Sequence, residues 1–212
     1  MKHLIFFVLV LLAGTAHAQT YIGGSVGYGT NKAPGDIRPL VAASYTYDRE
    51  STASSAFMGQ RRGVWGVEAG AFTLPKFYGT GFVSDYATYK GDGKKHEITT
   101  ARIKQDISGT ALYARAQAYA PSVKGFTAYG FAGVALSLNR SHEYGYYDET
   151  KWVENDQRFR TVAPIVGVGV QYAMTPRLSA RVEYLQASGI VKNPHTGKRN
   201  VEMLSVGFVR AF

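Results

Sequence analysis

The end of the chain, Val201 to Phe212, constrains the fold most, because its side chains alternate in size with a period of two. Every second residue back from the end is mostly bulky: Phe212, Arg210, Phe208, Val206 and Leu204. The residues between them are mostly small: Ala211, Val209, Gly207, Ser205 and Met203. A period of two places successive side chains on opposite faces of a β-strand. The bulky face would point into the core of a soluble sandwich, but outward into lipid in a membrane barrel.

The start of the chain decides between these two architectures. Residues 1–18 contain Lys2, an almost unbroken apolar run from Leu4 to Ala13, and the small-x-small site Ala16-His17-Ala18. This pattern predicts a secretory signal peptide. Its apolar run is too short to span a bilayer comfortably as a helix. We therefore expect cleavage before Gln19 and a single mature domain that covers residues 19–212.

The composition of the mature chain favours membrane-spanning strands over helices. Charged residues make up 18% of the whole sequence, which has 15 tyrosines, 24 glycines and no cysteine. No second apolar run is long enough for a transmembrane helix, and a closed barrel is the other structure that satisfies every backbone group in hydrocarbon. The absence of cysteine excludes a lipid-modified N-terminal cysteine and a disulfide framework. The formal charge is +9, and loss of Lys2 with the signal peptide leaves +8.

Eight segments show the alternation of a strand. They span residues 20–29, 38–47, 63–74, 107–119, 126–138, 159–172, 178–188 and 201–212. From the third segment onward, the connections between them alternate long and short, which is typical of short periplasmic turns and longer external loops. We predict an all-β fold, an eight-stranded antiparallel up-and-down transmembrane β-barrel, and an outer-membrane β-barrel domain over residues 19–212. The connection over residues 48–62 is longer than this rule expects for its side of the barrel.

Four charged residues fall on the inward face of this alternation. Glu68, Arg115, Arg181 and Glu183 cannot sensibly face lipid, and strand rise places three of them at similar heights, with Arg181 one inward step lower. Two acids balance two bases, so the set is interpreted as a paired polar plug inside the lumen. The alternative is a gate for ions or protons. A general diffusion pore is not expected, because eight strands enclose a space that side chains fill.

Five segments carry a resemblance to a known family. They are Gly66-Val-Glu-Ala-Gly70, Leu112-Tyr113, Val166-Gly-Val-Gly-Val-Gln-Tyr172, Arg181-Val-Glu-Tyr184 and Leu204-Ser-Val-Gly-Phe208. As an ordered set they resemble the small outer-membrane β-barrel proteins, which are similar to the transmembrane domain of outer membrane protein A. The resemblance implies insertion by the barrel assembly machinery, with Phe212 and Phe208 as the assembly signal. The family pattern favours an aromatic residue two positions before the last, where this chain has Arg210.

The histidines of the mature chain do not suggest an active site. Some outer-membrane barrels that edit lipid A use serine, histidine and an acid. Here His96, His142 and His195 fall in predicted external loops, and the neighbouring Ser141 would point the opposite way in an extended segment. We predict that the protein is not an enzyme and has no cofactor and no metal site.

The predicted external loops are the remaining places for interaction. Residues 143–147 contribute three tyrosines, and residues 90–104 and 192–199 are rich in lysine, arginine and histidine. We predict a structural or surface-interaction role: envelope integrity, adhesion or contact with lipopolysaccharide and other outer-membrane lipids, with a host or surface ligand as a further possible partner. Nucleic acid is not expected as a partner, because no binding fold for it is present. The alternatives are a small gated channel or a lipid A-modifying enzyme.

Overall fold

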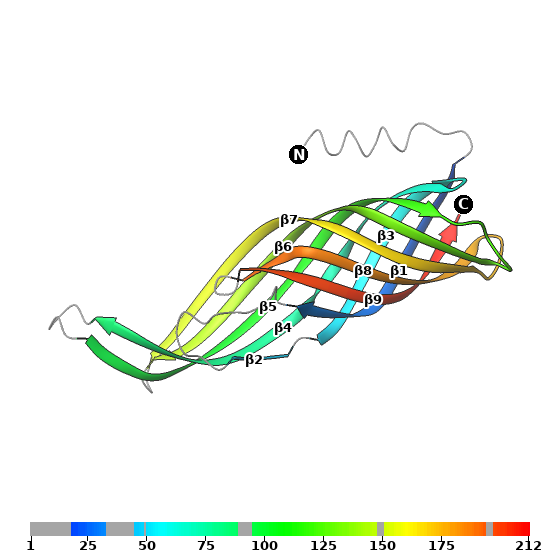
Figure 1. Ribbon diagram of the computed structural model, residues 1–212. Helices are drawn as coiled ribbons and strands as arrows, with labels where there is room; N and C mark the ends of the chain where they lie inside the picture. The colour runs from blue at the N-terminus through cyan, green and yellow to red at the C-terminus, as the bar shows by residue number, and fades with distance from the viewer. Residues whose placement is uncertain (1–17, 33–44, 49, 89–94, 148–150, 194–196) are drawn as a thin grey trace.

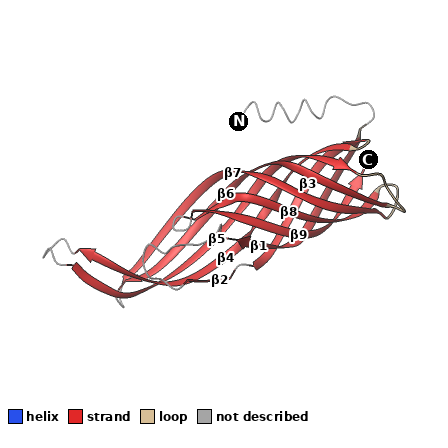
Figure 2. Cartoon of the chain, viewed as in Figure 1, coloured by secondary structure: helices blue, strands red, loops and turns tan. Residues whose placement is uncertain are grey.

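The computed structural model describes residues 18–32, 45–48, 50–88, 95–147, 151–193 and 197–212. The predicted signal peptide lies outside the described residues, apart from Ala18. Nearly all described residues belong to β-strands (Figures 1 and 2). In this part of the chain, no helix has the length and apolar character needed to cross a membrane.

Eight strands close into one antiparallel barrel. They are β1 (Gln19–Lys32), β3 (Glu50–Arg62), β4 (Trp65–Thr88), β5 (Lys95–Tyr119), β6 (Phe126–Tyr147), β7 (Lys151–Ala173), β8 (Leu178–Asn193) and β9 (Gly197–Ala211). Neighbours pair in this order, and β1 also pairs with β9. The predicted eight-stranded up-and-down barrel is confirmed. Because β9 pairs with β1, neither the first nor the last barrel strand is left as an open edge in the membrane, where water cannot satisfy backbone groups.

The second barrel strand differs from the prediction. It is β3, which pairs with β1 from Gln19↔Arg61 to Thr30↔Glu50, so the interpretation of residues 48–62 as a connection was wrong. The outward positions of β3 carry small or polar side chains such as Thr52 and Ser54, and their low hydrophobicity concealed the alternation. Of the segment predicted as a strand, residues 38–44 lie outside the described residues. The rest falls largely in the short strand β2 (Tyr45–Asp48), which pairs with the outer part of β4.

Four of the strands also extend into the segments that were predicted to be long loops. Strands β4 and β5 pair as far as Thr88↔Lys95, and β6 and β7 as far as Tyr147↔Lys151. These two hairpins reach well past the rest of the barrel in Figure 1. Outside the membrane both faces of a strand contact water, so the apolar alternation that marks a membrane strand disappears there.

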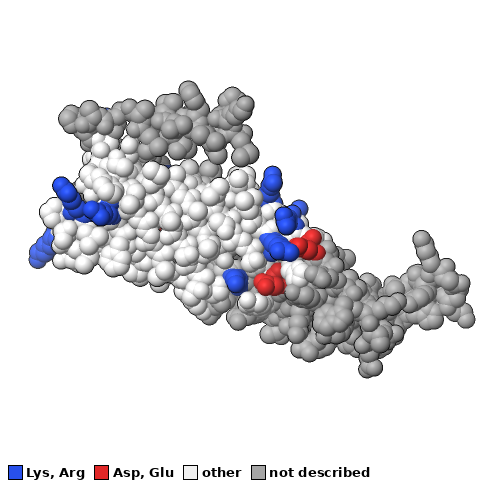
Figure 3. Space-filling view, turned by 180° about the vertical axis from the view of Figure 1, so that it is seen from behind, with Lys and Arg blue, Asp and Glu red and all other residues white. Residues whose placement is uncertain are grey.

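The faces of the membrane strands agree with the predicted alternation. In β9, Leu204, Val206 and Phe208 are exposed on the outer surface, whereas Met203 and Ser205 are buried inside. Exposed valines line the outer face of β7 in the same way. Figure 3 shows a band free of charged side chains, with charged residues at both of its ends. This band is the surface that faces hydrocarbon.

The short turns gather at the end of the barrel where β1 begins and β9 ends (Figure 1). They include Gly63 with φ 58° and Gly125 with φ 84°, a conformation that glycine adopts without strain. In barrels of this kind, short turns and both termini lie in the periplasm. The opposite end, with the long hairpins, is therefore extracellular.

The outer half of the lumen is filled by apolar side chains and by β8 itself. Phe72, Ile165 and Met203 are among the buried residues at this level. The pairing of β7 with β8 ends at Ile165↔Ala187, and β8 shifts register between Ala187 and Val191. Beyond that point, the β6 side chains Ser137 and Asn139 donate hydrogen bonds across the lumen to the β8 carbonyl oxygens of Ile190 (2.6 Å) and Lys192 (3.2 Å) respectively. The outer end of β8 thus helps to close the mouth of the barrel.

Candidate functional site in the barrel lumen

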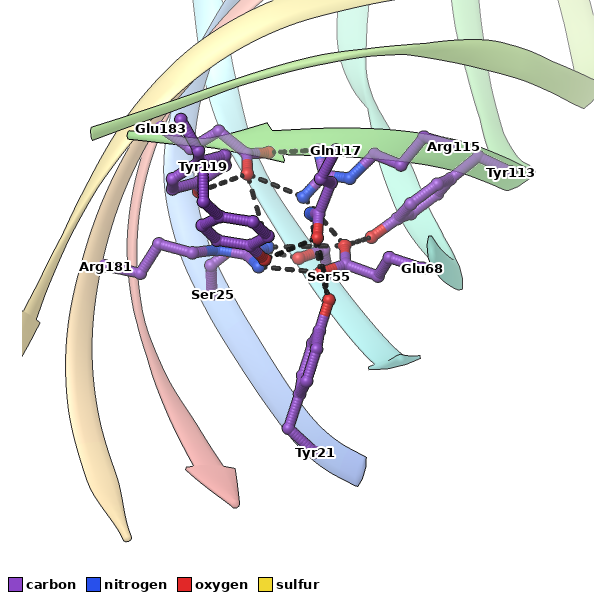
Figure 4. A network of polar contacts seen from close by, with 11 residues as sticks. Tyr21, Ser25, Ser55, Glu68, Tyr113, Arg115, Gln117, Tyr119, Arg181 and Glu183 are labelled. Carbon is purple, nitrogen blue, oxygen red and sulfur yellow. Dashed lines mark hydrogen bonds and ion pairs between the residues drawn. The ribbon is translucent and has the colours of Figure 1, made fainter. Parts of the chain in front are cut away.

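The four charged residues predicted to face the lumen lie together inside it. Glu68 and Arg115 are direct cross-strand partners on β4 and β5, whereas β8 contributes Arg181 and Glu183. All four residues are buried, with exposed fractions between 3% and 5%. Figure 4 shows their side chains converging from these strands on the centre of the barrel.

The four side chains form a closed ring of ion pairs. Arg115 Nη2 lies 2.7 Å from Glu68 Oε1 and 2.6 Å from Glu183 Oε2. Arg181 completes the ring, with Nη1 2.8 Å from Glu68 Oε2 and Nη2 3.3 Å from Glu183 Oε2. Each carboxylate therefore contacts both guanidinium groups, and the formal charges cancel. Such mutual compensation offsets the cost of removing four charges from water.

Tyrosine hydroxyls and one amide supply further hydrogen bonds to the carboxylates. Tyr113 donates to Glu68 at 2.7 Å, and Tyr129 donates to Glu183 at 2.8 Å. Tyr21 and Gln117 each contact Glu68 Oε2, at 3.1 and 3.2 Å. These side chains and the four charged ones are called the lumen network below. Among the four charged side chains, the Nε atom of Arg115 is buried without a hydrogen-bond partner. The many remaining hydrogen bonds and ion pairs of the lumen network favour a single arrangement.

Aromatic rings cover the two guanidinium groups. The Cζ atom of Arg115 lies 3.9 Å from the ring centroid of Phe131, and that of Arg181 lies 3.8 Å from that of Phe57. Cation–π contacts of this kind are strengthened when water is excluded. The lumen network is thus enclosed by aromatic side chains as well as by the barrel wall.

Each of these rings lies opposite a glycine on a neighbouring strand. Gly23 is the cross-strand partner of Phe57, and Gly167 that of Phe131. A Cβ atom at either glycine would lie 2.3 Å from the partner ring. The glycines therefore provide the space in which the aromatic side chains lie across the sheet. Phe57 is not among the predicted site residues, because its segment was predicted to be a connection, although the glycines of β1 could have indicated a ring opposite them.

The predicted assembly-signal residues lie far from this network, on the outer surface. Phe208 and Phe212 are 57% and 67% exposed. Arg210 is exposed between them, with its Cζ atom 5.6 Å from the ring centroid of Phe212. The Phe212 amide donates to the carbonyl oxygen of Thr20 at 3.0 Å, which ties the end of the chain to the beginning of β1.

The histidines are not gathered into a site among the described side chains. His142 lies half-buried on β6, and the adjacent Ser141 is buried on the opposite, inward face. The side chain of His96 and the whole of His195 lie outside the described part of the chain. Among the residues that are described, no group of three or more His, Asp or Glu side chains is placed to hold a metal ion.

Several solved protein structures are similar to this chain. Neisserial surface protein A is 16% identical, with 92% of this chain and 99% of that chain covered and a TM-score of 0.54. Ail, the attachment invasion locus protein of Yersinia pestis, solved with the heparin analogue sucrose octasulfate, is 12% identical, with 92% and 99% covered and a TM-score of 0.46. The outer membrane protein OprG from Pseudomonas aeruginosa is 17% identical, with 92% and 95% covered and a TM-score of 0.45.

The family assignment rests on the sequence as well as on the fold. No curated protein matches the chain. The family model for the OmpA-like transmembrane domain matches residues 15–212, which include all eight barrel strands. The chain therefore belongs to the family of OmpA-like transmembrane domains and is an integral β-barrel protein of the outer membrane.

Proposed function

We propose that this protein stabilises the cell envelope and contacts lipids and surface ligands, rather than conducting solutes or catalysing a reaction. The observation that carries this proposal is the closure of the lumen at two levels. The lumen network fills one level, and apolar side chains with the outer end of β8 fill the next. A barrel closed in this way has no path for general diffusion.

Exposed cations at the extracellular boundary of the apolar band support contact with lipid. On the outer face of β7, Val162 is 68% exposed, and the next two outward side chains toward the extracellular end, Arg160 and Arg158, are exposed as well. Lys192 and Lys198 are exposed and directly opposite each other on β8 and β9. Lipopolysaccharide presents phosphate groups at this depth, and arginine and lysine are suited to bind phosphate. We propose that these four side chains contact lipopolysaccharide and other lipids of the outer leaflet.

One cation of this region has a carboxylate partner. Arg140, directly opposite Arg158 in the ladder, donates through Nε to both carboxylate oxygens of Asp156, at 2.8 and 2.9 Å. These hydrogen bonds hold the pKa of the exposed Asp156 carboxyl below its usual range. Asp156 therefore stays ionised and pairs with Arg140, so the proposal assigns phosphate to Arg158 and Arg160 on β7, with Lys192 and Lys198, but not to Arg140.

Lipopolysaccharide binding can be measured on the purified protein as a rise in thermal stability. We expect lipopolysaccharide to raise the melting temperature more than phosphatidylcholine does, and Arg158→Gln with Arg160→Gln to remove most of the difference. Lys124→Gln, at an exposed position in a periplasmic turn, is the matched control and should leave the difference intact. Equal stabilisation by the two lipids in the parent protein would contradict the proposed contact.

The other predicted partners are also assigned to exposed parts of the barrel. The extended β4–β5 and β6–β7 hairpins are the proposed contact with a host or surface ligand, and Phe212 with Phe208 is the proposed signal for the barrel assembly machinery. An enzymatic role receives no support from Ser141 and His142, which face opposite sides of β6. A steady single-channel conductance of the parent protein would favour the gated-channel alternative and contradict the sealed lumen.

A further inference from the structure

A cavity lies at the periplasmic end of the lumen, beneath the lumen network. Its volume is about 250 Å³, and the turn between β7 and β8 forms part of its rim. Tyr21 and Tyr119 line its inner end, and both hydroxyls donate to Gln117 Oε1, at 2.8 and 2.6 Å. Since the lumen network closes the barrel beyond these tyrosines, the cavity is reached from the periplasm. It is called the periplasmic vestibule below.

Two arginines line the vestibule, and among the residues that the structure describes no aspartate or glutamate lines it. Arg61 is held in place from two sides: its Nε donates to the carbonyl oxygen of Gly63 at 3.1 Å, and its Cζ lies 4.1 Å from the ring centroid of Tyr119. Neither contact neutralises its charge. Arg177 lies on the β7–β8 turn at the opposite side of the rim, and Thr127 and Ser179 add hydroxyl groups to the wall.

The carboxylates of the lumen do not balance these two arginines. Glu68 and Glu183 are each shared by Arg115 and Arg181, so the lumen network is already neutral. The vestibule therefore has an excess of positive charge inside a concave wall of low dielectric constant, which concentrates the field on anions. Cleavage after Ala18, which the sequence predicts, would place the new amino terminus on Gln19, another residue of the lining.

We propose that the periplasmic vestibule is a binding site for a small oxyanion, that is, a phosphate or carboxylate group presented from the periplasm. Guanidinium groups bind both kinds of group through paired charge-assisted hydrogen bonds, and hydroxyls can donate to the remaining oxygens. The volume suits a free ion with some of its water or the anionic end of a larger molecule. This site lies at the opposite end of the barrel from the extracellular cations that are proposed to contact lipid, so either proposal can fail alone.

The test is an NMR titration of the ¹⁵N-labelled protein, purified from membranes in detergent. The probes are inorganic phosphate and acetate, with neutral acetamide as the control ligand, and the amide signals of Gly125, Thr127 and Ser179 report on the vestibule. We expect saturable shifts with phosphate, acetate or both, and the responding anion identifies the class of group that binds. Absence of saturable shifts with both anions, or an equal response to acetamide, would overturn the proposal.

Variants distinguish anion binding at the periplasmic vestibule from nonspecific attraction of anions to a basic protein. Arg61→Gln and Arg177→Gln should each weaken binding by about tenfold or more, as expected when a charge-assisted hydrogen bond is lost. Arg62→Gln is the matched control, because Arg62 adjoins Arg61, is exposed and does not line the vestibule. Equal weakening by Arg62→Gln would overturn the proposal. Arg177→Gln, at an exposed turn position, keeps the test valid if Arg61→Gln fails to fold.

Discussion

Glu68 and Arg115 are direct cross-strand partners whose side chains meet 2.7 Å apart with no exposed surface on either. Each member of the pair also contacts an oppositely charged side chain of β8, Arg115 with Glu183 and Glu68 with Arg181, which closes the ring. The charges thus join strands that are not neighbours in the sheet, and we expect them to stabilise one arrangement of the closed barrel.

Glu68→Ala should strongly destabilise the folded barrel. It would leave Arg115 and Arg181 with only Glu183 to share, and removal of one partner from a buried ion pair costs about 3 to 5 kcal/mol. Samples are heated to a series of temperatures before electrophoresis. The temperature at which the fast-migrating folded band disappears measures this effect. Lys198→Ala, at an exposed position, should leave that temperature unchanged in detergent without lipopolysaccharide. Equal behaviour of the two variants would show that Glu68 is solvated rather than buried in the ring.

Tyr113→Phe isolates one hydroxyl of the lumen network. The substitution removes the hydrogen bond of 2.7 Å to Glu68 Oε1 but keeps the ring. Because the acceptor is a buried carboxylate, we expect a loss of about 1.5 to 3 kcal/mol in the free energy of unfolding, measured by urea denaturation in detergent. Tyr172→Phe removes a hydroxyl from an exposed, outward ring and should change the free energy little. A similar loss in both variants would indicate a general effect of tyrosine hydroxyls.

Gly167→Ala tests the space that the glycines give to the aromatic rings. Its Cβ would lie 2.3 Å from the Phe131 ring and 2.2 Å from the carbonyl oxygen of Tyr184, so backbone as well as side chain must shift. Overpacking of this kind costs about 1 to 3 kcal/mol. The matched control is Gly130→Ala, on the adjacent β6 strand, whose Cβ would approach nothing closer than 3.8 Å. Unchanged unfolding of Gly167→Ala would mean that Phe131 has room to move.

The sequence predicts strands and the direction of their side chains best where one face of the strand contacts lipid and the other faces the lumen. In β5, Leu112 points outward and Arg115 inward as the alternation requires. The prediction failed at β3, because the outward positions Thr52 and Ser54 lack the apolar side chains that mark a membrane face. It also failed beyond the membrane, where β4–β5 and β6–β7 continue through strand pairing that needs no apolar face.

Only part of the lumen network could be predicted from the sequence. Strand alternation identifies Glu68 and Glu183 as inward, but their heights in the barrel depend on strand tilt and register between strands, which no local pattern contains. The contact of Arg181 with Phe57 joins β8 to β3, which do not pair with each other in the sheet. Such contacts arise only when the barrel closes, so the aromatic enclosure of the guanidinium groups could not be predicted from spacing.

Deletion of Phe212 tests the role of the last strand in assembly. β9 pairs with β1 from Tyr21↔Ala211 to Lys32↔Asn200 and so closes the barrel, and Phe212 itself is tied to Thr20 by one backbone hydrogen bond at 3.0 Å. Because its side chain faces outward and makes no contact in the lumen, deletion should remove the proposed assembly signal without removing any side chain of the lumen network. We expect the truncated chain to be exported and cleaved but to accumulate unfolded in the periplasm, as measured by fractionation and heat-modifiability. Arg210→Tyr is the companion variant: it replaces a charge at the interface by an aromatic residue and should assemble at least as well as the parent. Normal outer-membrane levels of the deletion variant would show that strand pairing alone directs insertion.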